Sequence, residues 1–454
     1  MRCNFRPPVA RDSERQILGL LALLAGLALA SCVPLKQYHT DRTPGECGDR
    51  PQGDCLTTYV ENHEEYLLGF VEFDDLGWAW DRAQGRVLFR EIRRHRGDVL
   101  MVLFTHGWKH NADPCDSNVT CFRETLRGLH AAETALYGDD ARRIVGIYVG
   151  WRGDSTRGKL LRQTSFFGRK STAHKVGSGA LTELIVRLKE EREMRGKDSR
   201  LVIVGHSFGG AAVFSATSQL IMDRLATAAE RGGSVRGLGD LVVLVNPAFE
   251  AARYQPLFET LNEETVGSDP SDPERMATYP PEQAPVLAIF TSKGDTATGK
   301  WFSRGRALAA GKDKARSDLQ RRANRAAVGH FEEFRTHSLT PKGAAVALAR
   351  VEDRSTEECG CPYGSASQRS MGESDEMRSD LDRLRSLRFA GARAVEFGDV
   401  VLRQDKGPDH SPILVASVDD SIIKGHNDIY RPAFVDFLRW FIMLSAEQGR
   451  DEGD

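Results

Sequence analysis

The stretch LVIVGHSFGGAAVFSA (residues 201–216) decides how this chain is expected to fold, because one serine separates two runs of different character. The first run is rich in Val, Ile and Leu without polar alternation, which predicts a strand buried on both faces of a parallel sheet. The small residues from Gly209 onward favour the start of a helix. Ser207 is therefore predicted to lie in a strand-to-helix turn, either as a small residue that fits the turn or as a nucleophile.

Similar apolar runs recur along the chain and predict further parallel strands. The predicted strands are residues 66–73, 99–105, 143–151, 200–205, 241–246, 286–291 and 413–418. Helix-compatible stretches lie between several of them, for example residues 181–188, whose leucines and isoleucine recur at helical spacing. This alternation predicts an α/β fold in one domain, residues 61–448, with a mostly parallel sheet flanked by helices.

Two insertions interrupt the predicted pattern. Residues 152–178 are basic, rich in Gly and Ser, and contain Phe166 and Phe167, which either form the apolar lip of a lid or pack against the sheet. Residues 299–410 are too long for one crossover and include charged and low-complexity segments. The basic segments could attract anionic groups, but charge runs are more often solvated surface.

The segment GHSFG, from Gly205 to Gly209, follows a predicted strand and precedes a predicted helix. A nucleophile elbow requires this order, because glycines beside the serine remove side chains that would collide where strand and helix approach each other. The helix N-terminus also directs N–H groups towards a developing oxyanion. Here the sequence resembles the α/β-hydrolase superfamily.

The resemblance extends to LFTHGWKHNA (residues 103–112), since a His-Gly pair often follows the third strand in that superfamily. It implies an oxyanion hole formed by the backbone N–H groups of Phe208 and Trp108, with Gly107 and His206 beside the substrate. His106 is four residues from His110, a spacing that could suggest a metal site. Both lie at a strand exit, however, so we expect no metal and no cofactor.

In this superfamily the triad follows the order serine, acid, histidine, which implies that the base comes after Ser207. His426 is the best placed histidine, because it lies between the last predicted strand and the C-terminal helical run. His330 and His337 fall in the long insertion and are expected to be structural or rim residues. His410 precedes its strand, at the wrong end of a parallel sheet.

Asp295 is the preferred acid, because it follows the penultimate predicted strand after a short loop. Its role would be to hold the tautomer of His426 and to stabilise the imidazolium. The alternative is a turn aspartate after Gly294. Glu250, after the preceding strand, is the second candidate for the acid, and Asp428 is too close to His426 in sequence.

The resemblance implies a serine hydrolase that cleaves carboxylic esters, acyl lipids among them, through an acyl-enzyme on Ser207. The same triad could serve an acyltransferase, a thioesterase or a peptidase, and a hydrolase fold could also persist as a non-catalytic envelope binding protein. A net charge of −2 gives no indication of nucleic acid binding.

The N-terminus is typical of an export signal, with arginines before an apolar run at residues 17–30. That run is shorter than the roughly 20 residues of a membrane helix. The segment LASC, ending at Cys32, resembles the lipobox of bacterial lipoproteins, which implies a signal peptide over residues 1–31 and lipidation of Cys32. Val33 at the next position implies, in that family, a lipid anchor in the outer membrane facing the periplasm. We expect residues 32–60 to be a polar linker and 449–454 a tail.

Six cysteines remain beyond Cys3 and Cys32, and an even number in an exported chain suggests disulfides. The local pairs Cys47–Cys55 and Cys115–Cys121 are favoured, which would leave Cys359 and Cys361 free. A zinc site is the alternative, but no C-x-x-C or H-x-H spacing supports it.

Overall fold

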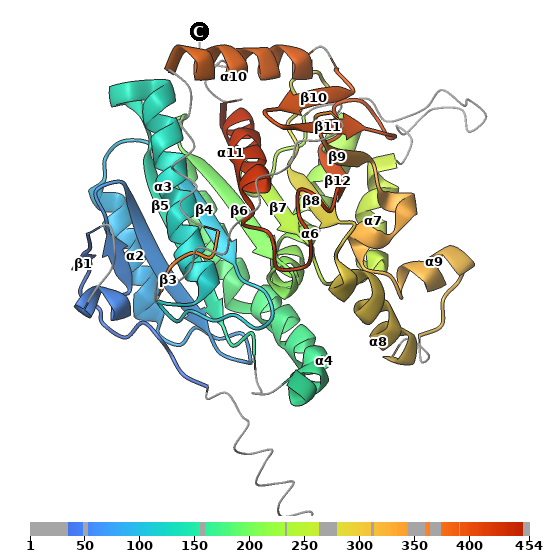
Figure 1. The fold of residues 1–454 in the computed structure, drawn as a ribbon, viewed down its shortest axis with the longest axis horizontal. Coiled ribbons are helices and arrows are strands. Elements are labelled where there is room, and N and C mark those ends of the chain that lie inside the picture. The colour runs from blue at the N-terminus through green and yellow to red at the C-terminus, as the bar shows by residue number, and fades with distance from the viewer. Residues whose placement is uncertain are drawn as a thin grey trace, which may run out of the picture.

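The computed structural model describes residues 35–48, 53–154, 159–231, 234–262, 279–309, 313–343, 359–363, 374–389 and 391–447. The predicted signal peptide, the lipidation site Cys32 and the tail lie outside these residues. Within the described ranges, no helix is both long enough and apolar enough to cross a membrane. The described strands form one mixed, largely parallel sheet with helices on both faces, which is an α/β architecture (Figure 1).

All seven predicted strands are present, each within one residue of its predicted ends. They are β3 (Tyr66–Phe73), β4 (Val99–Thr105), β5 (Arg143–Trp151), β6 (Arg200–His206), β7 (Leu241–Val245), β8 (Leu287–Ser292) and β12 (Ile413–Val418). They pair in parallel in the spatial order β3-β5-β4-β6-β7-β8-β12. Every residue of β4, β6, β7, β8 and β12 is buried, as runs without polar alternation predict.

Five further strands extend the sheet at its two edges, and they come from segments where no strand was predicted. β1 (Gly45–Glu46) and β2 (Val60–Asn62) lie beside β3, so part of the predicted linker belongs to the sheet. β9 (His337–Pro341), β11 (Val400–Gln404) and β10 (Ala394–Phe397) lie beyond β12 and come from the long insertion. Most pairings at these edges are antiparallel.

Helices cover both faces of the sheet, and one face lies towards the viewer in Figure 1. That face carries α3 (Ser117–Tyr137), α10 (Ser374–Phe389) and α11 (Pro432–Glu447). The opposite face carries α2 (Arg82–Arg94), α4 (Lys159–Val176), η3 (Gly177–Leu181), α5 (Thr182–Glu193), α6 (Phe208–Arg231) and α7 (Ala251–Asn262). The alternation within each strand supplies both cores: in β4, Val102 and Phe104 face α3, while Met101 and Leu103 face the other layer.

The remaining helical segments follow β8 in the chain. They are η4 (Ala297–Trp301), α8 (Phe302–Ala309), α9 (Asp318–Ala323), η6 (Val328–His330) and η7 (Glu332–Phe334). Figure 1 shows α8 and α9 together at one side of the molecule, next to α7. The long insertion thus contains helical turns near β8 as well as the added edge strands.

The order of the strands creates a switch point between β4 and β6. The chain leaves β4 through α3 towards β5, whereas it leaves β6 through α6 towards β7 on the other side. Connections that depart in opposite directions open a crevice at the carboxyl ends of the two strands, which is where open α/β sheets bind ligands. His106 and Ser207 follow the ends of β4 and β6 at this switch point.

The observed disulfides confirm one of the two predicted pairings and show that the other is wrong. Cys47 pairs with Cys55, as predicted, but Cys115 pairs with Cys359 and Cys121 pairs with Cys361. Residues 359–363 of the long insertion lie beside the start of α3, where the Thr120 hydroxyl donates to the Gly360 carbonyl. The spacing of the cysteines in the sequence could not predict these two bonds, because more than 200 residues separate the partners.

The two long-range disulfides close nearly the same loop, which predicts a non-additive effect on stability. Once one bond has formed, the other constrains only the few residues between the two bridges, so it removes little further entropy from the unfolded chain. Replacing Cys115 and Cys359 by serine should lower the melting temperature slightly. Removing both pairs should cost about 2–5 kcal/mol. Thermal unfolding of the three proteins checks this, and equal, additive losses would contradict it.

Candidate active site

Ser207 occupies a strained turn between β6 and α6. Its φ of +56° lies in the left-handed region that side chains rarely adopt. A Cβ on Gly205 would lie 2.8 Å from the Gly209 carbonyl oxygen, and a Cβ on Gly209 would lie 2.1 Å from the Thr105 carbonyl oxygen. Only glycine fits at these two positions, because the first turn of α6 crosses directly against β6 and the end of β4.

The turn places the Ser207 hydroxyl against two other side chains that the sequence singled out. Ser207 Oγ lies 2.7 Å from His426 Nε2, and His426 Nδ1 lies 2.8 Å from Asp295 Oδ2. Ser207 and Asp295 are almost fully buried, whereas 15% of the His426 side chain is exposed. Three residues from the ends of β6, β8 and β12 thus form one hydrogen-bonded chain, with the histidine nearest to solvent.

Asp295 is held as a carboxylate by the groups around it. Burial raises the pKa of Asp295, but the charge of His426 and hydrogen bonds from His426 and Thr298 outweigh it and lower this pKa to about 2. The backbone N–H groups of Ala297 and Thr298 donate to Oδ1 at 2.9 and 3.0 Å. The Thr298 hydroxyl donates to Oδ2, the same oxygen that faces His426.

His330 continues this chain, although it was expected to be a structural or rim residue. Its Nε2 lies 3.0 Å from Thr298 Oγ1. Since the Thr298 hydroxyl proton goes to Asp295, the His330 ring must donate to Thr298. Burial lowers the pKa of His330, so its ring is held neutral and serves as a donor behind the acid. His330 thus supports Asp295 indirectly and lies far from the Ser207 hydroxyl in the chain of hydrogen bonds.

Asn246 and His206 hold the loop that carries His426 in place. Asn246 Nδ2 donates to the His426 carbonyl at 2.9 Å, and Asn246 Oδ1 accepts from the Ser292 N–H at 2.9 Å. His206 Nε2 donates to the same carbonyl at 2.8 Å. The His206 ring is buried, so it supports this loop from inside the protein, whereas the sequence placed it beside the substrate.

Sequence reasoning did not identify Asn246 as part of the site. The signal that could have found it is its position, because an amide directly after β7 lies at the same sheet edge as Ser207 and Asp295. Its φ of +46° is tolerated by asparagine better than by most residues, which fits a tight exit from the strand. Asn246 therefore joins the ends of three neighbouring strands.

The two loops that carry the acid and the base also contact each other directly. The Ser292 hydroxyl donates to the Ile423 carbonyl. A Cβ on Gly294 would lie 2.1 Å from the Lys424 carbonyl oxygen, so the backbones meet without an intervening side chain. This contact fixes the separation of Asp295 and His426.

The two backbone groups expected to form an oxyanion hole flank the serine. Phe208 is the first residue of α6, where helix N–H groups point out of the helix end. Trp108 follows Gly107 after β4, and a Cβ on Gly107 would lie 2.7 Å from the Ser207 Cβ. The HGW loop therefore lies directly against the serine, and the next residue, Lys109, also has a positive φ.

The alternative acid and bases are placed elsewhere. Glu250 bonds with Lys170 and accepts from Arg306 Nε at 3.0 Å, away from His426. His337 lies in β9, where burial lowers its pKa to about 4. His410 lies near Gly391 at the opposite end of β12.

The remaining residues that the sequence raised have other partners. His106 Nε2 accepts from the Trp151 N–H, and His110 pairs with Asp116. Asp428 accepts a hydrogen bond from the Tyr363 hydroxyl. Across the described residues, no group of three His, Cys, Asp or Glu side chains is arranged to hold a metal ion.

Comparisons with known proteins add little to this geometry. No family model matches the chain, and no curated protein matches it. The chain is similar to one solved structure, a crystal structure of an uncharacterized protein from Pseudomonas aeruginosa, at 13% identity with a TM-score of 0.19. The alignment covers 50% of this chain and 42% of that one, so the chain spans less than half of its length. A likeness of this size carries no argument.

The space around two helical glycines predicts opposite effects of glycine-to-alanine substitutions on the free energy of unfolding. Gly209→Ala forces a Cβ against the Thr105 carbonyl and should lower the free energy of unfolding by about 3 kcal/mol. Gly85→Ala in α2 meets no atom within 4 Å and should raise the free energy of unfolding by about 0.5–1 kcal/mol through helix propensity. Urea unfolding measures both, and a Gly209→Ala protein as stable as wild type would refute the tight turn.

Proposed function

We propose that this protein is a serine hydrolase of the α/β-hydrolase type that cleaves carboxylic esters. The observation that carries the proposal is the continuous chain Ser207–His426–Asp295, with hydrogen bonds of 2.7 and 2.8 Å. The serine lies in a strained turn at the switch point of the sheet, which is where open α/β sheets bind ligands.

The reaction begins when the Ser207 oxygen attacks the acyl carbon and its proton passes to His426 Nε2. Asp295, ionised by its surroundings, accepts the Nδ1–H of His426, which leaves Nε2 free to take that proton. The protonated His426 then gives the proton to the departing alcohol oxygen as the ester C–O bond breaks. Water, activated by the same imidazole, cleaves the acyl-serine and releases the carboxylate.

The negative charge on the tetrahedral oxygen would be stabilised by the backbone N–H groups of Phe208 and Trp108. Phe208 begins α6, so the positive end of the helix dipole adds to this stabilisation. Gly107 permits the approach of the second group, because any side chain there would collide with Ser207.

Acyl lipids are the substrate class that best fits the predicted lipid anchor at Cys32, which would hold the enzyme in the cell envelope, at the outer membrane facing the periplasm. The insertion at residues 152–178 forms α4 and would contribute to the entrance of the crevice. Arg169 is tied to Asp75, so the C-terminal half of α4 is anchored to the loop after β3. The side chains of Phe166 and Phe167, the predicted lid residues, lie outside those that the structure describes. The same triad also serves acyltransferases, thioesterases and peptidases.

A serine-directed fluorophosphonate tests the proposal most directly. The wild-type protein should be labelled at Ser207, because the reagent requires a serine whose proton is removed by a neighbouring base. Ser207→Ala should not be labelled. Intact-mass spectrometry after labelling measures both.

Ser215→Ala is the matched control. Its hydroxyl also lies near a histidine, with Oγ 2.8 Å from His174 Nδ1, but it donates its proton to the Ala211 carbonyl. Ser215→Ala should therefore be labelled like wild type. Absence of labelling in the wild type, or equal labelling of Ser207→Ala, would sink the hydrolase proposal and leave a binding protein.

The choice of acid gives a second test. Asp295→Asn should lower kcat on p-nitrophenyl butyrate by about 10⁴-fold, because the asparagine favours the wrong histidine tautomer. Glu250→Gln should leave kcat within a few-fold of wild type but lower the melting temperature, since it leaves the buried Lys170 without its carboxylate. A reversed pattern would assign the acid role to Glu250.

A further inference from the structure

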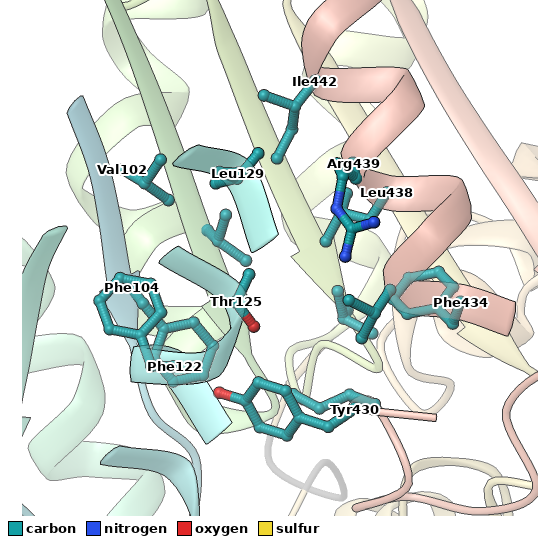
Figure 2. Close-up of a pocket in the computed structure, with 14 residues that line it drawn as sticks. Val102, Phe104, Phe122, Thr125, Leu129, Tyr430, Phe434, Leu438, Arg439 and Ile442 are labelled. Atoms are coloured by element: carbon teal, nitrogen blue, oxygen red, sulfur yellow. The ribbon is translucent and has the colours of Figure 1, made fainter. Parts of the chain in front are cut away.

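An internal cavity lies between the sheet, α3 and α11 (Figure 2). Its volume is about 40 Å³, whereas one water molecule needs about 10–15 Å³. Its walls are almost entirely apolar and include Val102, Phe104, Phe122, Leu129, Val245 and Phe434. Water is a poor occupant of such walls, because it needs two to four polar partners.

One charged group enters this cavity. Figure 2 shows the guanidinium of Arg439 pointing from α11 into the space between Thr125 and Phe434. The Arg439 side chain is 8% exposed, and its Nη2 has no hydrogen-bond partner among the residues that the structure describes. Its other terminal nitrogen, Nη1, has a long contact of 3.5 Å with Asp436.

Two other buried arginines, Arg123 and Arg142, are paired much more closely. Arg123 bonds both oxygens of Glu61, at 2.7 and 3.0 Å, and Arg142 bonds both oxygens of Glu133. A buried guanidinium nitrogen without a hydrogen-bond partner costs free energy. Arg439 Nη2 therefore directs into the cavity a donor that no described residue satisfies.

We propose that this cavity binds a short-chain monocarboxylate, in the range from acetate to butyrate. The carboxylate would accept from Nη2 of Arg439, and the alkyl chain would lie against Phe104, Phe122 and Phe434. A carboxylate matches the planar donor geometry of a guanidinium, and an apolar chain matches the walls. The volume limits the chain to a few carbon atoms.

The cavity is separate from the triad but adjoins it. Ile429 and Tyr430, which follow His426 in the same loop, line the cavity, as does Val204 of β6. A ligand there would pack against the loop of the base without touching Ser207. The binding proposal rests on Arg439 and the cavity walls, and it stands whether or not the protein is a hydrolase.

Calorimetric titration of the purified full-length protein with sodium butyrate tests the proposal, with sodium chloride at the same ionic strength and butan-1-ol as comparison ligands. Butyrate should bind saturably and raise the melting temperature, whereas chloride and butanol should not. Arg439→Gln should weaken butyrate binding at least tenfold, since a hydrogen bond to a charged group contributes about 1.5–3 kcal/mol. Arg90→Gln, an exposed arginine of α2, is the matched control and should bind like wild type.

Leu129→Phe gives an independent test that keeps the charge. It fills the cavity from α3 and should abolish butyrate binding even if Arg439→Gln fails to fold. Butyrate bound in the crevice near Ser207 would persist in both variants, and that result would overturn the proposal. Equal binding of butanol, or no binding of butyrate to wild type, would overturn it as well.

Discussion

The close contact between the start of α6 and the ends of β4 and β6 is the constraint on which the rest of the site depends. Gly209 lies against the Thr105 carbonyl at a distance that excludes any side chain, and Ser207 accepts a positive φ as a result. Strain of this kind persists only where the surrounding structure over-determines it. Here the fully buried parallel strands β4, β6 and β7 provide that support, and the turn places Ser207 at the switch point.

Around this turn, the loops are held in place by hydrogen bonds from polar side chains at the strand ends. Asn246 links the exits of β7, β8 and β12 through its amide, and Ser292 bonds to the backbone ahead of His426. Loops at a sheet edge carry many backbone N–H and C=O groups that require partners. Side chains that satisfy these groups also fix the distance between Asp295 and His426, so the same hydrogen bonds satisfy the backbone and align the two side chains.

The sequence predicts the parts of this fold that depend on local chemistry. The seven buried strands follow from unbroken apolar runs, and the turn at Ser207 follows from its flanking glycines. The edge strands β1, β9, β10 and β11 do not stand out, because half-exposed strands lack such runs. The Cys115–Cys359 disulfide depends on where the long insertion packs against the rest of the domain, and the spacing of the cysteines does not predict that position. The sequence does not identify Asn246 and does not connect His330 with Asp295, because each acts through another residue.

The position of α4 depends on contacts between residues that lie far apart in the sequence. Arg169 reaches Asp75 across 94 residues, and Lys170 reaches Glu250 across 80. These ion pairs are largely buried, so breaking one leaves an uncompensated charge and shifts α4. A triad residue, by contrast, needs only its place at a strand end. The candidate triad is therefore predictable from short motifs, whereas the position of α4 depends on ion pairs between residues that no motif connects.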